Sequence, residues 1–492
     1  MSSDSGITYR LADWIAGSTY EDLPRRVVEE AKNQILSMIA AVHAGHFSDA
    51  GRCVSRTVKE WTGSKEATLI PSGERTSVHY TIAGNAALGA ALDYDDYMLG
   101  ARTGPSAVLT TLAVAEKLGS GGPEFLLAQV LANEVSGRAG LAAGFGPLDD
   151  QVNSFVHLLG SAVSAAKLLK LDRQQTANAL GIAMLQPTML LPAGFYGSEA
   201  KLLSAALIAP VGVQAAEMAA NGLRGAHEVF EGERGFLRAF AQPALPGAFK
   251  GYGKVWLTES LGYKVYPGSV YVAAIIDCVL GLVRQHHLDP RKTHAIYVGA
   301  GPQALAMDGR SAPYVQGPES LATTLNHSVA YNVAVALTDR ELSPRQFTRD
   351  RIKDPAVWEL AGKVRLSLDD DLARRARERS PLRAAGEDGS TAHLFDLETA
   401  DLVGFKTALG ARVRIELDGG RNFEMEQESP SGSGARPFDD RRKAVEDKFR
   451  RETRYTLRKE RMEKAIDIVH HLEESSASHI RELARLCCSE KA

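Results

Sequence analysis

The sequence predicts a mainly helical protein with a smaller α+β part. The chain has 492 residues, more than a single hydrophobic core usually organises, so two domains are expected. Helical spacing of apolar residues dominates from Leu11 to about Leu261, whereas strand-like patterns occur only after Tyr266. We therefore predict a large helical domain over residues 1–265 and a smaller α+β domain over 266–437. The C-terminal helices, over 438–492, are predicted to rejoin the helical domain.

The helical domain is predicted from a helix start signal and from runs of small residues. Leu23-Pro24 after Asp22 is typical of a helix start, and apolar residues then repeat at helical spacing. Small side chains with few charges between them let helices approach closely. Three segments of this kind are predicted to be core helices: Ala83–Ala91, Ser161–Leu169 and Ala205–Ala220.

The α+β domain begins with one apolar helix, Val270–Val283. Three short segments are apolar or alternate apolar with polar residues, as strands do: Ala295–Val298, Val364–Leu368 and Val413–Leu417. The last of them runs into Asp418-Gly419-Gly420, which predicts a hairpin turn. Glu428–Pro437 has the composition of a flexible loop, and helical periodicity returns at Asp440–Leu472.

Composition and charge argue against several classes of function. The net charge is −3, both signs are interspersed and the pI is about 6.5, so no nucleic-acid partner is expected. The four cysteines have no zinc-ligand or disulfide spacing. The N-terminus has no basic segment leading into an apolar run, and we find no stretch of roughly 20 apolar residues. We expect a cytoplasmic protein with no metal, cofactor or membrane partner.

Three carboxylates lie within four residues at Asp93, Asp95 and Asp96, directly after an apolar helix. Their mutual repulsion would raise the pKa of one of them and suit it to acid/base chemistry. The alternative is a helix end that carries solvated acids. The residues alone leave both interpretations open.

A lysine and a histidine in apolar surroundings are further candidates. Lys201 lies in Ser198–Lys201 within a segment of small apolar residues, where its charge needs a partner. Such a lysine binds a carboxylate, acts as an acid or base with a lowered pKa, or extends its ammonium group to the surface. His157 lies between apolar residues and is either a substitute base or a residue of the pocket wall.

A dinucleotide-like fingerprint occurs at Gly299–Ala304, after the strand at Ala295–Val298. Pro302 is unfavourable in the turn, and no repeated βαβ pattern surrounds the motif. We therefore expect no dinucleotide cofactor.

Three motifs together resemble the MmgE/PrpD family: Ala91–Asp96, Leu169–Ala183 and Gly197–Lys201. The named members of that family include 2-methylcitrate dehydratase and cis-aconitate decarboxylase. The resemblance covers nearly the whole chain and implies a helical domain with an inserted α+β lid. It also implies cofactor-independent lyase or isomerase chemistry on a small organic acid or ketone, and a homodimer formed through the helical domain.

The resemblance implies roles for individual residues. Asp93 matches the aspartate that lines the active site, and Lys201 matches the family's lysine. Tyr331, in the segment Asn326–Tyr331, matches a lid tyrosine that donates a proton, and His327 lies in the same segment. Tyr331 packing as a purely structural residue is the alternative. Tyr266 belongs to the Tyr-Pro motif at the start of the lid.

The sequence departs from the family at several histidines. These histidines are replaced by Thr103 or Gly104, by Gln151, and beyond Tyr266 by Ser269 and Ala273. Tyr97 stands where the family has threonine. Because imidazoles suit small polyanions, their loss predicts a less cationic pocket and a larger, less charged substrate.

The preferred hypothesis is a lyase or isomerase of specialised metabolism that moves a proton next to a carbonyl or carboxyl group. Asp93 would be the base, Tyr331 the acid and Lys201 the substrate anchor. The predicted substrate-binding residues are Tyr97, Thr103, Gln151, His157, Tyr266, Ser269 and His327. The alternatives are ordinary 2-methylcitrate dehydratase or cis-aconitate decarboxylase activity, and a non-catalytic binding or dimerisation protein.

Overall fold

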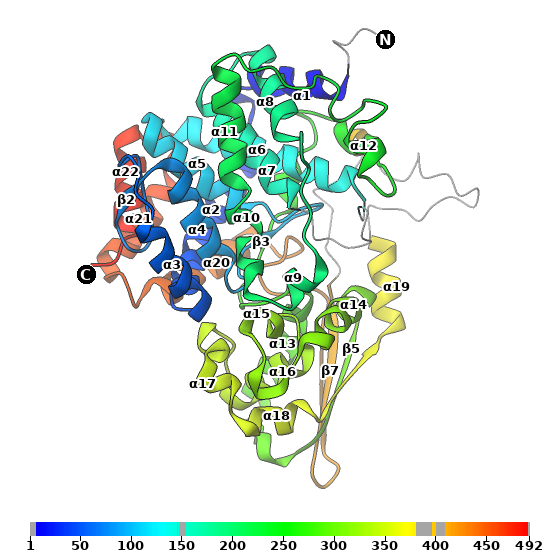
Figure 1. Ribbon diagram of the computed structural model, residues 1–492. Helices are drawn as coiled ribbons and strands as arrows, with labels where there is room; N and C mark the ends of the chain where they lie inside the picture. Colours follow the sequence, from blue (N-terminus) through cyan, green and yellow to red (C-terminus); the bar gives the residue numbers. More distant parts are fainter. Residues whose placement is uncertain (1–5, 145, 147–153, 380–395, 400–408, 491–492) are drawn as a thin grey trace, which may run out of the picture.

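The computed structural model describes residues 6–144, 146, 154–379, 396–399 and 409–490. The chain forms a large helical part and, beneath it in Figure 1, a smaller part that contains a four-stranded sheet. This arrangement confirms the predicted fold class. Gln151, one of the predicted substrate-binding residues, lies outside the described residues.

The helical part begins with a series of long helices. They are α1 (Ile7–Gly17), α2 (Arg25–His46), α3 (Asp49–Glu60), α4 (Val78–Ala90), α5 (Gly104–Leu118), α6 (Gly122–Ala142), α7 (Phe155–Leu168) and α8 (Arg173–Ala183). Shorter helices follow: α9 (Pro192–Tyr196), the 3₁₀ turn η3 (Glu199–Leu202), α10 (Leu203–Ala206), α11 (Ala209–Ala220) and α12 (Phe236–Ala239). Two small ladders join β1 (Ala67–Thr68) to β2 (Arg75–Thr76) and β3 (Asp96–Tyr97) to β4 (Gly262–Tyr263).

Caps and small residues define these helices as the sequence predicts. Pro24 precedes the first residue of α2, and most residues along the length of that helix are buried. Asp172 accepts a hydrogen bond from the backbone of Gln175 and so caps α8. The predicted core segments Ala83–Ala91 and Ser161–Leu169 correspond to α4 and α7.

The third predicted core helix, Ala205–Ala220, is interrupted. Its residues are divided between α10 and α11, with a break at Leu207 and Ile208. By length and composition, the wider segment Glu199–Ala220 is apolar enough to cross a membrane, which the sequence expectation had missed. More than half of its best window is buried, and α11 packs against α7 and α8 inside the fold.

The sheet-bearing part alternates helices with strands. Its helices are α13 (Val270–His286), α14 (Pro302–Ser311), α15 (Ala322–Leu325), α16 (Val329–Asp339), α17 (Arg349–Ile352), α18 (Pro355–Ala361) and α19 (Asp370–Arg379). Its strands are β5 (Thr293–Ala300), β6 (Val364–Leu368), β7 (Ala411–Leu417) and β8 (Asn422–Gln427). The predicted helix at Val270–Val283, the strands and the hairpin at Asp418–Gly420 are all confirmed.

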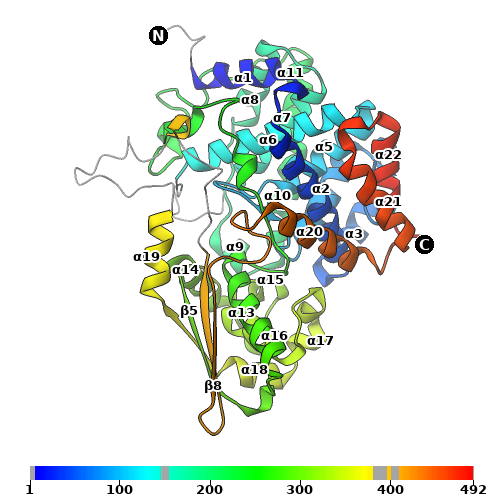
Figure 2. The same ribbon diagram turned by 180° about the vertical axis from the view of Figure 1, so that it is seen from behind.

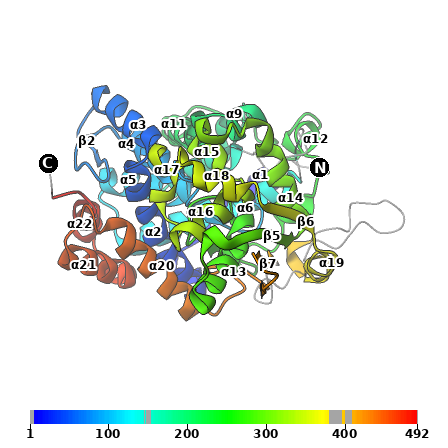
Figure 3. The same cartoon turned by 90° about the horizontal axis from the view of Figure 1, so that it is seen from below.

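The sheet has the order β6-β5-β7-β8, with β5 parallel to β6 and antiparallel to β7. Val413, Ile415 and Leu417 are buried, as their alternation predicts. Helix α13 packs on β7 and β8 while α16 packs on β6, so one face of the sheet is covered by helices (Figure 3).

The C-terminal helices pack beside the first helices of the chain. They are α20 (Phe438–Thr453), α21 (Lys459–His470) and α22 (Ala477–Leu486). Helix α20 lies against α2, and α22 contacts α5 (Figure 2). Residues from both ends of the sequence therefore build the helical part, and α20 passes close to the turn that follows α4.

Candidate active site

Asp93 lies in the turn after α4, in a backbone conformation that few residues other than glycine adopt. The helix ends at Ala90, and Asp93 has a φ of 50°, in the left-handed region. Residues held in such conformations are concentrated at functional sites. Here the turn places the buried carboxylate against side chains from several other segments of the chain.

A two-stranded ladder brings Lys264 to this turn. Strands β3 and β4 pair so that Asp96 faces Tyr263, and Lys264 is the next residue after β4. Lys264 Nζ donates to the Asp93 carbonyl oxygen at 2.9 Å and to Asp93 Oδ1 at 2.8 Å. It also donates to Asp95 Oδ1 at 2.9 Å. All three ammonium protons have acceptors, so Lys264 holds two carboxylates in place.

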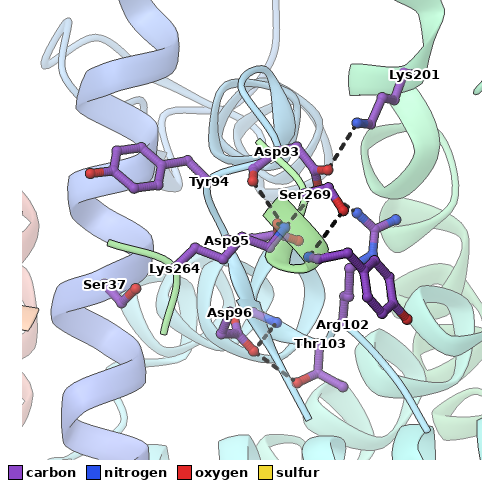
Figure 4. A network of polar contacts seen from close by, with 12 residues as sticks. Ser37, Asp93, Tyr94, Asp95, Asp96, Arg102, Thr103, Lys201, Lys264 and Ser269 are labelled. Atoms are coloured by element: carbon purple, nitrogen blue, oxygen red, sulfur yellow. Dashed lines mark hydrogen bonds and ion pairs between the residues drawn. The ribbon is translucent and has the colours of Figure 1, made fainter. Parts of the chain in front are cut away.

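Two more cations contact the Asp93 carboxylate (Figure 4). Arg102 Nη1 donates to Asp93 Oδ1 over 2.8 Å, and Lys201 Nζ lies 3.1 Å from Asp93 Oδ2. Lys201 belongs to η3, a short 3₁₀ turn, and not to the long apolar helix that the sequence suggests. Its side chain is buried, so its charge depends on partners inside the protein.

His327 is the second partner of Lys201. His327 Nε2 lies 2.8 Å from Lys201 Nζ and 3.7 Å from Asp93 Oδ2. Aromatic rings enclose the pair: the His327 ring centroid is 5.2 Å from that of Tyr196, and Lys201 Nζ is 4.8 Å from the Phe195 centroid. The predicted site residues Asp93, Lys201 and His327 thus form one contiguous cluster.

Burial and charge set the protonation of this cluster. Burial alone would raise the pKa of Asp93, but the charges of Lys201, Lys264 and Arg102 hold it well below its ordinary value. Burial lowers the pKa of Lys201 to about 8, although the charge of Asp93 opposes this shift. Burial also holds the pKa of His327 well below its ordinary value, and the charge of Lys201 adds to the effect. Near neutral pH the site holds an ionised Asp93, a neutral His327 and a Lys201 that is close to its titration point.

Asp96 belongs to a separate buried polar cluster. Its Oδ2 accepts from Gln34 Nε2 at 2.8 Å and from the backbone of Gly104 at 3.3 Å. The hydroxyl of Thr103 lies 3.5 Å from the same oxygen, so Thr103 serves this cluster and not Asp93. Burial raises the pKa of Asp96 to about 6, and the charge of Asp95 adds to the shift. Asp96 is therefore the acidic residue of the triplet whose pKa is raised.

His157 is buried beside the start of α5. Its Nδ1 lies 3.0 Å from the hydroxyl oxygen of Ser106. Burial lowers the pKa of His157 to about 3, and the charge of Arg102 lowers it further. The imidazole is therefore neutral near physiological pH, as expected for a residue of an apolar wall.

Helix α20 holds the backbone on both sides of the cluster. Lys448 Nζ donates to the Tyr94 carbonyl at 2.6 Å and to Ser37 Oγ at 3.0 Å. Arg451 donates to the Val265 carbonyl at 2.9 Å and also to the Tyr94 hydroxyl. Tyr94 lies between Asp93 and Asp95, and Val265 follows Lys264. Helix α20 thus fixes both backbone segments that carry the charges.

Models of two domains match nearly the whole chain. The MmgE/PrpD N-terminal domain matches residues 9–247, and the MmgE/PrpD C-terminal domain matches residues 266–474. The chain belongs to the MmgE/PrpD family.

Curated MmgE/PrpD relatives match at low identity. Human cis-aconitate decarboxylase is 26% identical over 377 residues, covering 74% of this chain and 77% of the relative. Cis-aconitate decarboxylase of Aspergillus terreus is 25% identical over 399 residues, covering 75% of this chain and 80% of the relative. A cis-aconitate decarboxylase-like protein, oryM of Aspergillus oryzae, is 25% identical over 391 residues, covering 73% and 79%. The chain is thus a distant homologue of these enzymes.

Tyr331, predicted from the MmgE/PrpD resemblance to be the catalytic acid, lies outside the Asp93 cluster. Its hydroxyl donates to the Gln346 carbonyl, and its ring packs 5.6 Å from Trp358 and 6.0 Å from Phe347 between centroids. Burial also raises the pKa of Tyr331 above its ordinary value. These contacts correspond to the structural alternative, and we assign Tyr331 no role as a proton donor.

The other predicted binding residues have local partners. The Tyr266 hydroxyl donates to Asp277 Oδ1 at 2.8 Å, so it joins helix α13 to the chain before it. Ser269 caps α13 by accepting from the backbone of Tyr271 at 3.4 Å. Tyr97 lies on β3 with a buried hydroxyl, and burial raises its pKa. None of these three hydroxyls contacts the Asp93 carboxylate.

Sequence reasoning missed two members of the cluster. Arg102 directly precedes Thr103, one of the positions that we compared with a family histidine, and its charge was a usable signal. Lys264 lies two residues before Tyr266 of the Tyr-Pro motif, and no role is predicted for it from the sequence. The predicted loss of positive charge is therefore incomplete, because Arg102 and Lys264 both place a cation against the Asp93 carboxylate.

Proposed function

We propose that this MmgE/PrpD protein is a lyase or isomerase of the cofactor-independent type, which moves a proton next to a carbonyl or carboxyl group. The observation that carries the proposal is Lys201, a buried lysine with a pKa of about 8 that contacts both Asp93 and His327. General acids and bases work best when their pKa lies near the working pH. Lys201 meets this condition better than any other member of the cluster.

Lys201 acts as the proton donor in this proposal. When the C–C bond to a carboxylate breaks, CO2 leaves and the electron pair stays on the substrate as an enolate or carbanion. The Lys201 ammonium gives this carbon a proton, a C–H bond forms, and the neutral amine is reprotonated from solvent. When a C–O bond breaks instead, the electron pair leaves with hydroxide: the neutral amine of Lys201 first takes the proton next to the carboxyl or carbonyl group and then passes it to the hydroxide, so that water forms. Isomerisation runs the same transfer in both directions at one or two carbons.

Asp93 is assigned an electrostatic role instead of the role of base that the sequence suggested. Its pKa is held well below the ordinary value by three cations, so the carboxylate has little affinity for a proton. It orients Lys201 and compensates the charges of Lys264 and Arg102. His327 accepts a hydrogen bond from Lys201 and connects it to the lid.

We propose a substrate of specialised metabolism that is larger and less charged than a tricarboxylate. The support is that Thr103, Ser269 and Ala273 stand where the family has histidines, so these positions bring no positive charge to the pocket. Ordinary cis-aconitate decarboxylation is the second candidate, since named relatives carry that activity and this chain keeps Asp93 and Lys201. A non-catalytic binding protein is the third candidate, and the buried position of the Lys201–Asp93 pair is compatible with it.

Turnover by Lys201→Met tests the proposal. We expect the variant to lose turnover of any acid that the wild type converts, because Lys201 is the proton donor that contacts both Asp93 and His327. Lys32→Met is the matched control, since Lys32 is equally buried and paired with Glu29 and Glu473 away from the cluster. Equal turnover by wild type and Lys201→Met would reject the assignment, and binding without any wild-type turnover would favour the non-catalytic candidate.

We also infer a homodimer through the helical part. Four large apolar side chains lie exposed along and around α10 and α11, with exposed fractions of 45–58%: Leu207, Val211, Met218 and Leu223. The first three lie four and seven residues apart, on one face of the segment, and a contiguous apolar face of this kind marks an interaction surface. The supporting observation is the exposure of this face on an otherwise well-packed segment.

A further inference from the structure

Arg102 differs from the other two cations of the cluster in its exposure. The Lys201 and Lys264 side chains are 2% and 3% exposed, whereas the Arg102 side chain is 29% exposed. A solute that approaches the cluster from solvent would therefore reach Arg102 first.

The hydrogen bonds of Arg102 leave most of its donors available. Its Nη1 donates to Asp93 Oδ1, whereas Nε and Nη2 have no hydrogen-bond acceptor among the described residues. A guanidinium carries five N–H donors, and the edge formed by Nε and Nη2 matches the two oxygens of a carboxylate. Lys264, in contrast, has used all three protons on Asp93 and Asp95.

Arg102 and Lys201 lie near the same aromatic ring. Arg102 Cζ is 5.3 Å and Lys201 Nζ is 4.8 Å from the Phe195 centroid. Both cations also contact Asp93, one at each carboxylate oxygen. A carboxylate bound to the free edge of Arg102 would therefore lie close to the proton of Lys201.

The charges of the cluster favour a ligand with one negative charge. Three cationic side chains, Arg102, Lys201 and Lys264, face two carboxylates, Asp93 and Asp95, and His327 is neutral. One positive charge is left for a ligand when Lys201 is protonated. A tricarboxylate would bring two further negative charges next to Asp93 and Asp95 without compensation from these residues.

We propose that Arg102 is the binding group for a single substrate carboxylate, and that it selects monocarboxylic over tricarboxylic acids. The proposal rests on the proposed function for the position of the carboxylate beside Lys201. Arg102 acts as a specificity-determining residue: it holds the substrate, while Lys201 transfers the proton. An arginine fork also orients a planar carboxylate, which a lysine at this position would not do.

Binding of a matched series of acids tests the proposal without requiring turnover. Butyrate, glutarate and tricarballylate carry one, two and three carboxylates on short saturated chains. Their dissociation constants would be measured by ligand-observed NMR on wild type, Arg102→Gln, Arg102→Lys and Lys201→Met. Arg291→Gln is the control, since Arg291 is an exposed arginine paired with Asp289 away from the cluster. Thermal unfolding of each variant verifies that it is folded.

We expect butyrate to bind wild type and the control more tightly than tricarballylate does. Arg102→Gln should weaken butyrate binding at least about tenfold, because a charge-assisted hydrogen-bond pair is lost. Arg102→Lys should recover only part of the affinity. Unchanged butyrate binding in folded Arg102→Gln, absence of butyrate binding to wild type, or preferential binding of tricarballylate would each overturn the proposal.

The same experiment separates this inference from the proposed function. Lys201→Met with retained butyrate binding and full turnover would reject the role of Lys201 and leave the Arg102 site intact. A second outcome is that Arg102→Gln loses binding while the protein converts a tricarboxylic acid in a Lys201-dependent reaction. This result would support the role of Lys201 in proton transfer and reject the selection of monocarboxylic acids by Arg102.

Discussion

Lys201 Nζ lies 2.8 Å from His327 Nε2, so a lysine of the helical part and an imidazole of the sheet-bearing part share one hydrogen bond. The two residues are 126 positions apart in the sequence. Below a pH of about 8 the ammonium group donates to Nε2, which requires the imidazole proton to be on Nδ1. The protonation of Lys201 and the tautomer of His327 are therefore coupled.

The first prediction concerns pH. Lys201 is the acid of the proposed reaction, and it is protonated below its pKa of about 8. We expect kcat to be constant on the acidic side of this pKa and to fall about tenfold per pH unit above it. The pH–rate profile of the converted substrate measures this, and a rate that rises through pH 8 would instead make the neutral amine a base.

The second prediction concerns His327. Replacing it with phenylalanine removes the acceptor that faces Lys201 and should lower kcat by about 10- to 100-fold through loss of orientation. Gln is the conservative variant, because its amide oxygen can still accept from Lys201, and it should restore part of the rate. His286→Phe, at a histidine of α13 that packs on Phe423, is the control. Equal rates for His327→Phe and wild type would disprove the coupling.

The third prediction concerns the stability effect of Asp96. Its folded pKa of about 6 lies above the ordinary value of 3.8, so the folded state binds more protons than the unfolded state between these values. The stability contributed by protonated Asp96 is therefore lost as the pH rises from about 4 to about 6. Asp96→Asn should raise the free energy of unfolding at pH 7 by about 1–3 kcal/mol and flatten its pH dependence. Urea unfolding at pH 4.5 and pH 7 measures both effects, and a variant that is less stable at pH 7 would contradict them.

The fourth prediction concerns Lys448, a positioning residue. Lys448→Met leaves the Tyr94 carbonyl without its donor, and the turn that carries Asp93 should shift. We expect kcat to fall about tenfold or more, with the alkaline limb of the pH–rate profile displaced, since the surroundings of Lys201 change. Lys443→Met, at an exposed position of the same helix, is the control. A loss of stability with kcat and its pH profile unchanged would show that α20 serves the fold alone.

The fifth prediction concerns the apolar face of α10 and α11. Leu207→Glu combined with Val211→Glu should convert the proposed homodimer into monomers, because two charges would be buried in the interface. Light scattering after size exclusion gives the molar mass. Arg56→Glu, at an exposed position on α3, is the control. A wild-type protein that elutes as a monomer would reject the dimer.

Local sequence signals were enough for most of the fold. The start of α2 after Pro24 and the β7–β8 hairpin at Asp418–Gly420 follow from caps, alternation and turn residues, which act over a few positions. The break at Ile208 was not predicted, since small apolar residues fit a continuous helix as well as an interrupted one. Lys201 itself lies before this break, in the turn η3 that precedes α10.

The candidate site was only partly predictable for a related reason. Asp93, Lys201 and His327 were identified from motifs that they keep, and the structure brings these three together. Lys264 reaches Asp93 through the β3–β4 ladder, and Arg102 does so across the turn before α5, so neither contact has a local signature. Tyr331 has a matching local motif, but the packing of α16 directs its hydroxyl to Gln346.

Deuterium exchange is the most direct test of the central claim that Lys201 transfers a proton next to a carboxyl or carbonyl group. Wild type and Lys201→Met would each be incubated in deuterium oxide with two groups of acids. The first group is 2-methylcitrate, citrate and cis-aconitate, and the second is a series of 2-enoic and 3-oxo monocarboxylic acids. NMR would measure the incorporation of deuterium into each acid. We predict that wild type places deuterium next to the carboxyl or carbonyl carbon of at least one monocarboxylic acid, and that Lys201→Met does not exceed the background rate. Exchange at the same rate in both proteins, or in neither, would contradict the account.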